Sequence, residues 1–269
     1  TLSPSSAASD VYKRQSPEYA QYLGLTIEDV AMKIALECVS RLEEEIGKYA
    51  VVGGVAVQLW TKHWYDDYRK FLRRTRDVDV ITEKRVTKRE FFRILRDLSK
   101  EYEVKGDEAR TCYEIVVKDD STKAAIHIPR LSRRRYEREK MKIRKSVENS
   151  TYLPLDDLEV NVGNEWELIE SKLRRSLYHS KNPRKVLRII KKMGKLIRKD
   201  PYKAQSKVYE AYIGILETLH TENFHSPRVQ RKLTEWKLLK DAYDISLLEY
   251  ISPCVNSDFI ETRLAELID

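Results

Sequence analysis

The stretch that decides the fold is residues 51–82, VVGGVAVQLWTKHWYDDYRKFLRRTRDVDVIT. An apolar, β-branched run ends in Gly53 and Gly54, and a helical pattern follows at once. This order predicts a buried strand, a tight glycine turn and a helix whose N-terminus exposes backbone N–H groups. Such an N-terminus is a suitable seat for phosphate, and glycine lets the backbone approach a ligand closely.

A second strand pattern closes the same stretch, in which Asp77 and Asp79 alternate with the apolar residues Val78, Val80 and Ile81. Because successive side chains on a strand point to opposite faces, both carboxylates are expected on one face. Two close carboxylates repel each other and bind a divalent cation, and Mg²⁺ prefers a pair of carboxylates with phosphate oxygens and water. The pattern predicts a Mg²⁺ site, although a D-x-D alone is common on surface strands.

The residues around this stretch predict a mixed α/β arrangement. A helix is expected from Thr26, as N-cap, to Ile46, and Gly47 ends it. Thr87 and Glu90 form a capping-box pattern that begins another helix. That helix runs to about Tyr102 and is expected to bury Phe91, Phe92, Leu95 and Leu98.

Two more strands are predicted at residues 113–118 and 124–128, and the pattern beyond about residue 155 is helical. Prolines separate the expected helices, which span residues 165–179, 183–199, 205–221 and 227–251. The predicted fold class is α+β, a mixed sheet with flanking helices followed by an all-helical C-terminal domain. The expected domains are residues 16–150 and 151–269.

Residues 1–15, TLSPSSAASDVYKRQ, are small, polar and without pattern. They resemble a translated sequencing-adapter segment, and the alternative is a natural disordered tail. In either case we expect a leader outside the fold. No apolar stretch has the ~18 residues that a transmembrane helix needs. The scattered cysteines fit neither a disulfide framework nor a zinc knuckle, so we expect a cytoplasmic protein with no membrane association.

The ordered set of strand, Gly53-Gly54, helix and then Arg74-Thr75-Arg76-Asp77-Val78-Asp79 resembles the DNA polymerase β-like nucleotidyltransferase superfamily. Within it the sequence is most similar to the AbiEii/AbiGii toxin-type family, over residues 30–130. The resemblance implies transfer of NMP from an NTP to a hydroxyl acceptor. Asp77 and Asp79 would hold the catalytic Mg²⁺, while Gly53, Gly54 and Thr75 would cradle the triphosphate. Toxins that add nucleotides to tRNA 3′ ends suggest an RNA acceptor and an antitoxin protein as partner.

Two later stretches resemble the last motif of this family. They are Glu170-Ser171-Lys172-Leu173 and Lys240-Asp241-Ala242-Tyr243-Asp244-Ile245. By this resemblance Lys172 would contact the triphosphate, and Asp241 would be an additional catalytic acid. Taken by themselves, both residues are equally well explained as surface residues of charged helices.

One departure from the superfamily pattern concerns the third carboxylate, which usually lies on a later strand. The aligned position in the predicted strand AAIHIP is His127. Two interpretations stay open. Asp241 could supply the missing acid, or the fold could be catalytically degenerate and bind RNA or a partner protein without catalysis.

The chain is basic, with a formal net charge of +8, which favours a polyanionic partner. The basic side chains concentrate in residues 130–145 and 181–203, and clusters of this size can neutralise several phosphates. The alternative is a solvated helix surface. Because both stretches accompany a predicted nucleotide site, we expect contact with a tRNA-like RNA.

Overall fold

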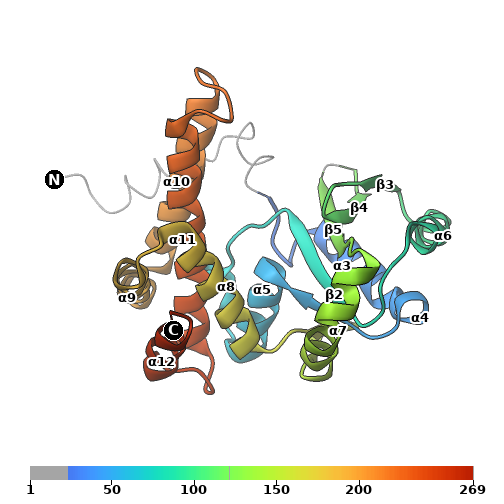
Figure 1. The fold of residues 1–269 in the computed structure, drawn as a ribbon, viewed down its shortest axis with the longest axis horizontal. Coiled ribbons are helices and arrows are strands. Elements are labelled where there is room, and N and C mark those ends of the chain that lie inside the picture. The colour runs from blue at the N-terminus through green and yellow to red at the C-terminus, as the bar shows by residue number, and fades with distance from the viewer. Residues whose placement is uncertain (1–23, 121, 269) are drawn as a thin grey trace. The chain divides into compact units, whose positions relative to one another are not determined.

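The computed structural model describes residues 24–120 and 122–268, so the expected leader 1–15 lies outside the described residues. The chain forms two compact units. Unit 1 contains the residues up to Leu59 together with Arg73–Asn164, and unit 2 contains Trp60–Leu72 together with the residues from Glu165 onward. Unit 1 holds the sheet, and unit 2 is helical (Figure 1).

Within the described residues of unit 1, seven strands form one sheet in the order β3-β4-β5-β2-β1-β7-β6. Strand β2 is parallel to β5 and β1 is parallel to β7, whereas the other neighbours are antiparallel. The sheet is therefore mixed, as predicted. The strands are β1 Tyr49–Val52, β2 Asp77–Thr82, β3 Val104–Glu108, β4 Cys112–Lys118, β5 Lys123–Pro129, β6 Thr151–Leu155 and β7 Leu158–Val162.

The two faces of the central strands differ in burial because apolar and polar residues alternate along them. In β2, Val78 and Val80 are buried, and in β5, Ile126 and Ile128 are buried. Helix α3 (Val30–Arg41) packs on β2, β4, β5 and β7, and α7 (Arg133–Glu148) packs on β1 and β2 (Figure 1). The intervening residues, including Asp77 and Asp79, point to the opposite face and remain partly exposed.

The remaining helices of unit 1 correct two expectations. Thr26 was expected to be the N-cap of a helix, but the N-cap position of α3 is Asp29. The backbone N–H and the hydroxyl of Thr26 donate to Asp29 Oδ2, closing a turn, and α3 begins only at Val30. The capping box at Thr87 and Glu90 is present and begins α6 (Lys88–Leu98), but Phe92 is 47% exposed instead of buried. Short α4 (Glu43–Ile46) ends at Gly47, as expected.

Strands β3, β6 and β7 were not predicted, and the wholly helical pattern expected beyond residue 155 is therefore wrong at its start. Strand β3 reads VKGDE and lacks an apolar alternation. The β6–β7 hairpin, residues 151–162, turns at Asp156, which has a positive φ of 55°. The hairpin joins the sheet through the parallel pairing of β7 with β1, a contact between segments distant in sequence.

Unit 2 is a helical assembly built around α11 (Pro227–Ile251), which packs against α8, α9 and α10 (Figure 1). The segment Asp241–Leu248 of α11 is buried at every position, so it forms the centre of this core. The helices are α8 Glu165–Ser180, α9 Pro183–Lys199, α10 Pro201–Leu219 and α12 Ser257–Glu266, with the short 3₁₀ helix η1 Tyr68–Phe71. In the part of the chain that the structure describes, no helix is long and apolar enough to cross a membrane.

Candidate metal and nucleotide site

Three adjacent strands bring four ionisable side chains to the partly exposed face of the sheet. Asp79 on β2 is paired in register with His127 on β5, and His127 is paired with Glu114 on β4. Imidazole Nδ1 of His127 lies 3.4 Å from Asp77 Oδ2 and 3.4 Å from Asp79 Oδ1. Its Nε2 lies 3.0 Å from Glu114 Oε2. The register of the sheet therefore places the histidine between the aspartate pair and a third carboxylate.

The carboxylates determine the protonation of this histidine. Hydrogen bonds to Asp77 first, and then to Asp79 and Glu114, raise the pKa of His127 to about 11, while partial burial opposes the rise. A protonated imidazole beside Asp77 and Asp79 neutralises part of their mutual repulsion. A metal ion at the same place would supply that positive charge instead, so protonation and metal binding compete here.

The residues present fit a divalent metal ion. One ligand atom from each of Asp77, Asp79 and His127 lies within 4.8 Å of the others, a separation that a single ion can bridge. The side chains are 37%, 44% and 26% exposed, so an ion and its remaining ligands can reach them. Two carboxylate oxygens and one ring nitrogen are an ordinary donor set for a divalent cation.

Gly53 lies against the metal-ligand candidates. It begins helix α5 (Gly53–Trp64) with a φ of 76°, a conformation that favours glycine. A Cβ at this position would lie 2.5 Å from Asp79 Oδ2. The missing side chain thus lets the helix N-terminus, where backbone N–H groups can bind phosphate, approach the carboxylate.

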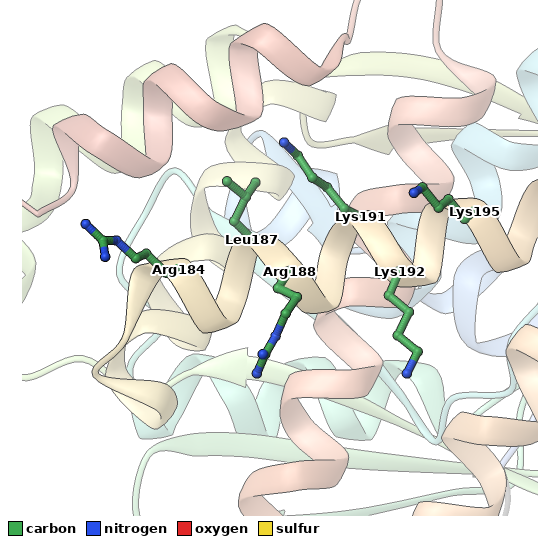
Figure 2. Close-up of a pocket in the computed structure, with 6 residues that line it drawn as sticks. All are labelled: Arg184, Leu187, Arg188, Lys191, Lys192 and Lys195. Carbon is green, nitrogen blue, oxygen red and sulfur yellow. The ribbon is translucent and has the colours of Figure 1, made fainter.

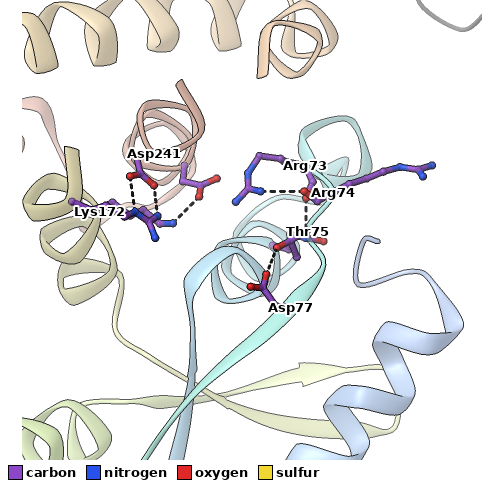
Figure 3. Close-up of polar contacts among 9 residues, drawn as sticks. Arg73, Arg74, Thr75, Asp77, Lys172 and Asp241 are labelled. Carbon is purple, nitrogen blue, oxygen red and sulfur yellow. Dashed lines mark hydrogen bonds and ion pairs between the residues drawn. The ribbon is translucent and has the colours of Figure 1, made fainter. Parts of the chain in front are cut away.

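Gly54 and Thr75 are also brought to this place. A Cβ on Gly54 would lie 2.8 Å from Arg73 Nη2 and 3.1 Å from Thr75 Oγ1. The Thr75 hydroxyl donates to Asp77 Oδ1 over 3.1 Å, and Arg73 Nη1 donates to the backbone carbonyl of Arg74 (Figure 3). The predicted residues Gly53, Gly54, Thr75, Asp77 and Asp79 form one continuous cluster.

Lys172 and Asp241 lie in unit 2, in two ion pairs that join α8 to α11 (Figure 3). Lys172 Nζ lies 2.6 Å from Asp244 Oδ2, and both side chains are buried. Asp241 is fully buried and accepts hydrogen bonds from the Arg175 guanidinium through both carboxylate oxygens. The description of these two residues as surface residues is therefore wrong.

Two residues of the site were missed from the sequence. Glu114 was missed because its place beside His127 depends on the register between β4 and β5. Arg73 was missed because nothing in the sequence shows that its side chain turns toward Gly54. Its burial (6% exposed) places a cationic side chain beside the N-terminus of α5.

The two basic stretches differ in how far their charges are neutralised. On α7, residues Arg135, Arg138 and Lys140 form ion pairs with glutamates of the same helix, and Arg144 pairs with Glu83. On α9 only Lys191 and Arg198 have a described partner, Glu261 and Glu249 respectively.

Four of the remaining cations of α9 form a stripe. Among residues 24–120 and 122–268, none forms an ion pair with Arg184, Arg188, Lys192 or Lys195, which are all exposed. Their spacing of four, four and three residues keeps them on one helix face. They border a shallow hollow over Leu187 (Figure 2). The apolar side of the same helix, with Val186, Ile190 and Ile197, is buried.

Comparisons with known proteins give one structural likeness. No family model matches the chain, and no curated protein matches it. Among solved structures the chain is similar to an antigenic nucleotidyltransferase-like protein from Paracoccidioides brasiliensis, with a TM-score of 0.43 and 14% sequence identity. The alignment covers 88% of this chain and 87% of that chain. At this level of similarity, the chemistry of the chain must be argued from its own residues.

Proposed function

We propose that this chain is a metal-dependent nucleotidyltransferase that transfers NMP from an NTP to a hydroxyl acceptor. The observation that carries the proposal is the cluster of Asp77, Asp79 and His127 against the glycine N-terminus of α5. Phosphoryl-group chemistry requires a metal site in direct contact with a phosphate-binding site. The sequence resemblance supports the same activity from the pattern of residues 51–82.

Each residue of the cluster has a role in this proposal. Asp77, Asp79 and His127 would hold the divalent ion, and Mg²⁺ is the ion that the family resemblance implies. When bound, such an ion neutralises charge on the phosphates and activates the attacking oxygen. Gly53 and Gly54 would present backbone N–H groups to the triphosphate, and Arg73 adds positive charge beside them. Thr75 orients Asp77 through its hydroxyl.

An experiment that tests the activity is incubation of the purified protein with each α-³²P-labelled NTP, Mg²⁺ or Mn²⁺, and total tRNA. Wild type should transfer label, and Asp79→Asn should lose transfer by about 10²-fold or more, because one charged metal ligand is removed. The matched control is Asp107→Asn, the same change at an exposed position of β3. Transfer that survives in Asp79→Asn at the level of Asp107→Asn would refute the proposal.

For the acceptor we propose RNA of tRNA-like type, bound through α9. Four cations on one face of α9 without a described ion-pair partner give a stripe suited to successive phosphates. On α7, four cations are already paired with glutamates: Arg135, Arg138, Lys140 and Arg144. Binding of this kind releases counterions and weakens with added salt.

The proposed RNA surface is tested by two triple-alanine variants. Arg188, Lys192 and Lys195 are replaced in one, and Arg135, Arg138 and Lys140 are replaced in the other. The α9 variant should bind total tRNA about tenfold or more weakly, and the slope of log affinity against log salt should fall by about three. The α7 variant should change both quantities less. Equal losses in the two variants would contradict the assignment to α9.

The resemblance to toxin-type proteins extends the proposal to a cytoplasmic toxin that an antitoxin protein neutralises. Expression in a bacterium should then arrest growth, and the Asp77→Ala/Asp79→Ala variant should not. In the same proposal Lys172 contacts the triphosphate and Asp241 acts as an acid. Lys172 is held in a buried ion pair and Asp241 is buried against the half-exposed Arg175, so these roles require the pairs to exchange partners.

A second candidate function is a degenerate module that binds RNA or a protein without catalysis. The observation that favours it is His127 Nδ1 facing Asp77 and Asp79, where an imidazolium would take the place of a metal ion. This candidate predicts RNA binding that does not respond to Mg²⁺ or to the loss of Asp77 and Asp79. Absence of transfer with every nucleotide, together with such binding, would support it.

A further inference from the structure

The candidate metal site differs from an all-carboxylate site in its third ligand. His127 offers a ring nitrogen where an acid would complete a set of three oxygens, and its Nδ1 is 3.4 Å from an oxygen of each aspartate. The ring lies between strands β2 and β4, so its two nitrogens face different carboxylates. Only one nitrogen is therefore directed at the metal position.

The other ring nitrogen is held in place. Nε2 lies 3.0 Å from Glu114 Oε2, on the strand next to β5 and in direct register with His127. A histidine that ligates a metal through one nitrogen commonly donates its other N–H to a carboxylate, which fixes the ring orientation and strengthens the ligand. Glu114 is placed for this role, because it contacts the imidazole on the side away from Asp77 and Asp79.

The donor set has a consequence for the choice of ion. Oxygen donors suit Mg²⁺, whereas an imidazole shifts preference toward first-row transition-metal ions. We propose that this site selects a transition-metal ion over Mg²⁺, with His127 as ligand through Nδ1 and Glu114 as the residue that positions it. This inference rests on the metal site of the proposed function and names which ion that site takes.

The test is calorimetric titration of metal-free protein with Co²⁺ and, separately, with Mg²⁺, without nucleotide. Wild type should bind Co²⁺ more tightly than Mg²⁺ by about tenfold or more, and the visible spectrum of bound Co²⁺ should report nitrogen ligation. His127→Asp supplies a third carboxylate and should lower the Co²⁺ to Mg²⁺ affinity ratio by about tenfold or more. An unchanged ratio in His127→Asp would overturn the inference.

Glu114→Gln tests the positioning role. It should weaken Co²⁺ binding by about tenfold and leave Mg²⁺ binding nearly unchanged, because the effect passes through the imidazole. If Glu114 had a merely structural role, its substitution would weaken the binding of Co²⁺ and of Mg²⁺ alike. Glu159→Gln, the same change at an exposed position of β7, is the control, and far-ultraviolet circular dichroism confirms that each variant is folded. Co²⁺ binding in Glu114→Gln equal to that in the control would contradict the role of Glu114.

Two outcomes separate this inference from the proposed function. Label transfer that is supported by Mg²⁺, with no preference for Co²⁺ in binding, would leave the enzyme proposal standing and overturn the selectivity. The inference would also be overturned if the wild-type protein bound neither Co²⁺ nor Mg²⁺ and the His127→Asp variant bound both. That result would favour the degenerate module, in which the imidazole replaces the ion.

Discussion

At the scale of single residues, Gly53 has little freedom to change. Its φ of 76° disfavours a side chain, and a Cβ added there would lie only 2.5 Å from Asp79 Oδ2. Two separate costs therefore arise on substitution, one in the backbone and one in displacement of a candidate metal ligand.

We predict that Gly53→Ala lowers metal affinity and nucleotide transfer by about tenfold or more, with a stability loss of about 1–3 kcal/mol. The change moves Asp79 and the N-terminus of α5 together. Gly214→Ala is the control, because a Cβ there would meet only Lys232 Nζ at 3.6 Å. Calorimetric metal titration and thermal unfolding measure the two effects, and a Gly53→Ala protein with wild-type metal affinity would contradict the prediction.

The candidate site was partly predictable from the sequence for a geometric reason. Gly53, Gly54, Thr75, Asp77 and Asp79 stand close together in one stretch, and strand periodicity alone places the two aspartates on one face. The location of His127 next to this pair, expected from the resemblance, agrees with the β2–β5 register. Glu114 needed the register of a further strand pair, which local patterns do not specify.

At the scale of secondary-structure elements, the helices of unit 2 were predicted well from the prolines that separate them and from helical periodicity. Helices α9 and α11 have the predicted bounds, since each begins with a proline that follows a capping residue. Helix α12 lies in the region expected to be helical, although its bounds were not predicted, and the strands β3, β6 and β7 were missed. These elements are short, and their stability comes from packing and pairing with distant segments instead of local preference.

Helices α8 and α11 are joined by the buried ion pair of Lys172 and Asp244, which makes this pair of helices sensitive to substitution. We predict that Lys172→Met destabilises the protein by about 3–5 kcal/mol, because it removes the ammonium group that lies 2.6 Å from the buried Asp244 carboxylate. The double variant Lys172→Met/Asp244→Leu should recover much of that loss. Chemical denaturation of the three proteins measures the difference, and a neutral single variant would contradict it.

At the scale of the whole molecule, two cysteines lie in different units and differ in their exposure to solvent. Cys38 in α3 is fully buried, and burial raises the pKa of its thiol to about 12, so it stays in the unreactive protonated form. Cys254 in unit 2 is exposed.

We predict that a thiol reagent at pH 8 modifies Cys254 rapidly and Cys38 only when unit 1 unfolds. The measurement is the time course of modification with and without denaturant, followed by peptide mass spectrometry. In a Cys112→Ser background, which removes the half-buried thiol of β4, Cys254→Ser should remove the rapid phase and leave the denaturant-dependent modification of Cys38 unchanged. Rapid labelling of Cys38 in native protein would contradict the packing of α3 on the sheet.

The pairing of β1 with β7 also bears on how the protein is made. One edge of strand β1 pairs with β2, and its other edge pairs with β7, which is synthesised much later. During synthesis the nascent chain therefore carries an open, apolar sheet edge, a known template for association between chains. A fragment that ends at residue 150 would keep that edge permanently, whereas one that continues through Asn164 includes the hairpin that covers it.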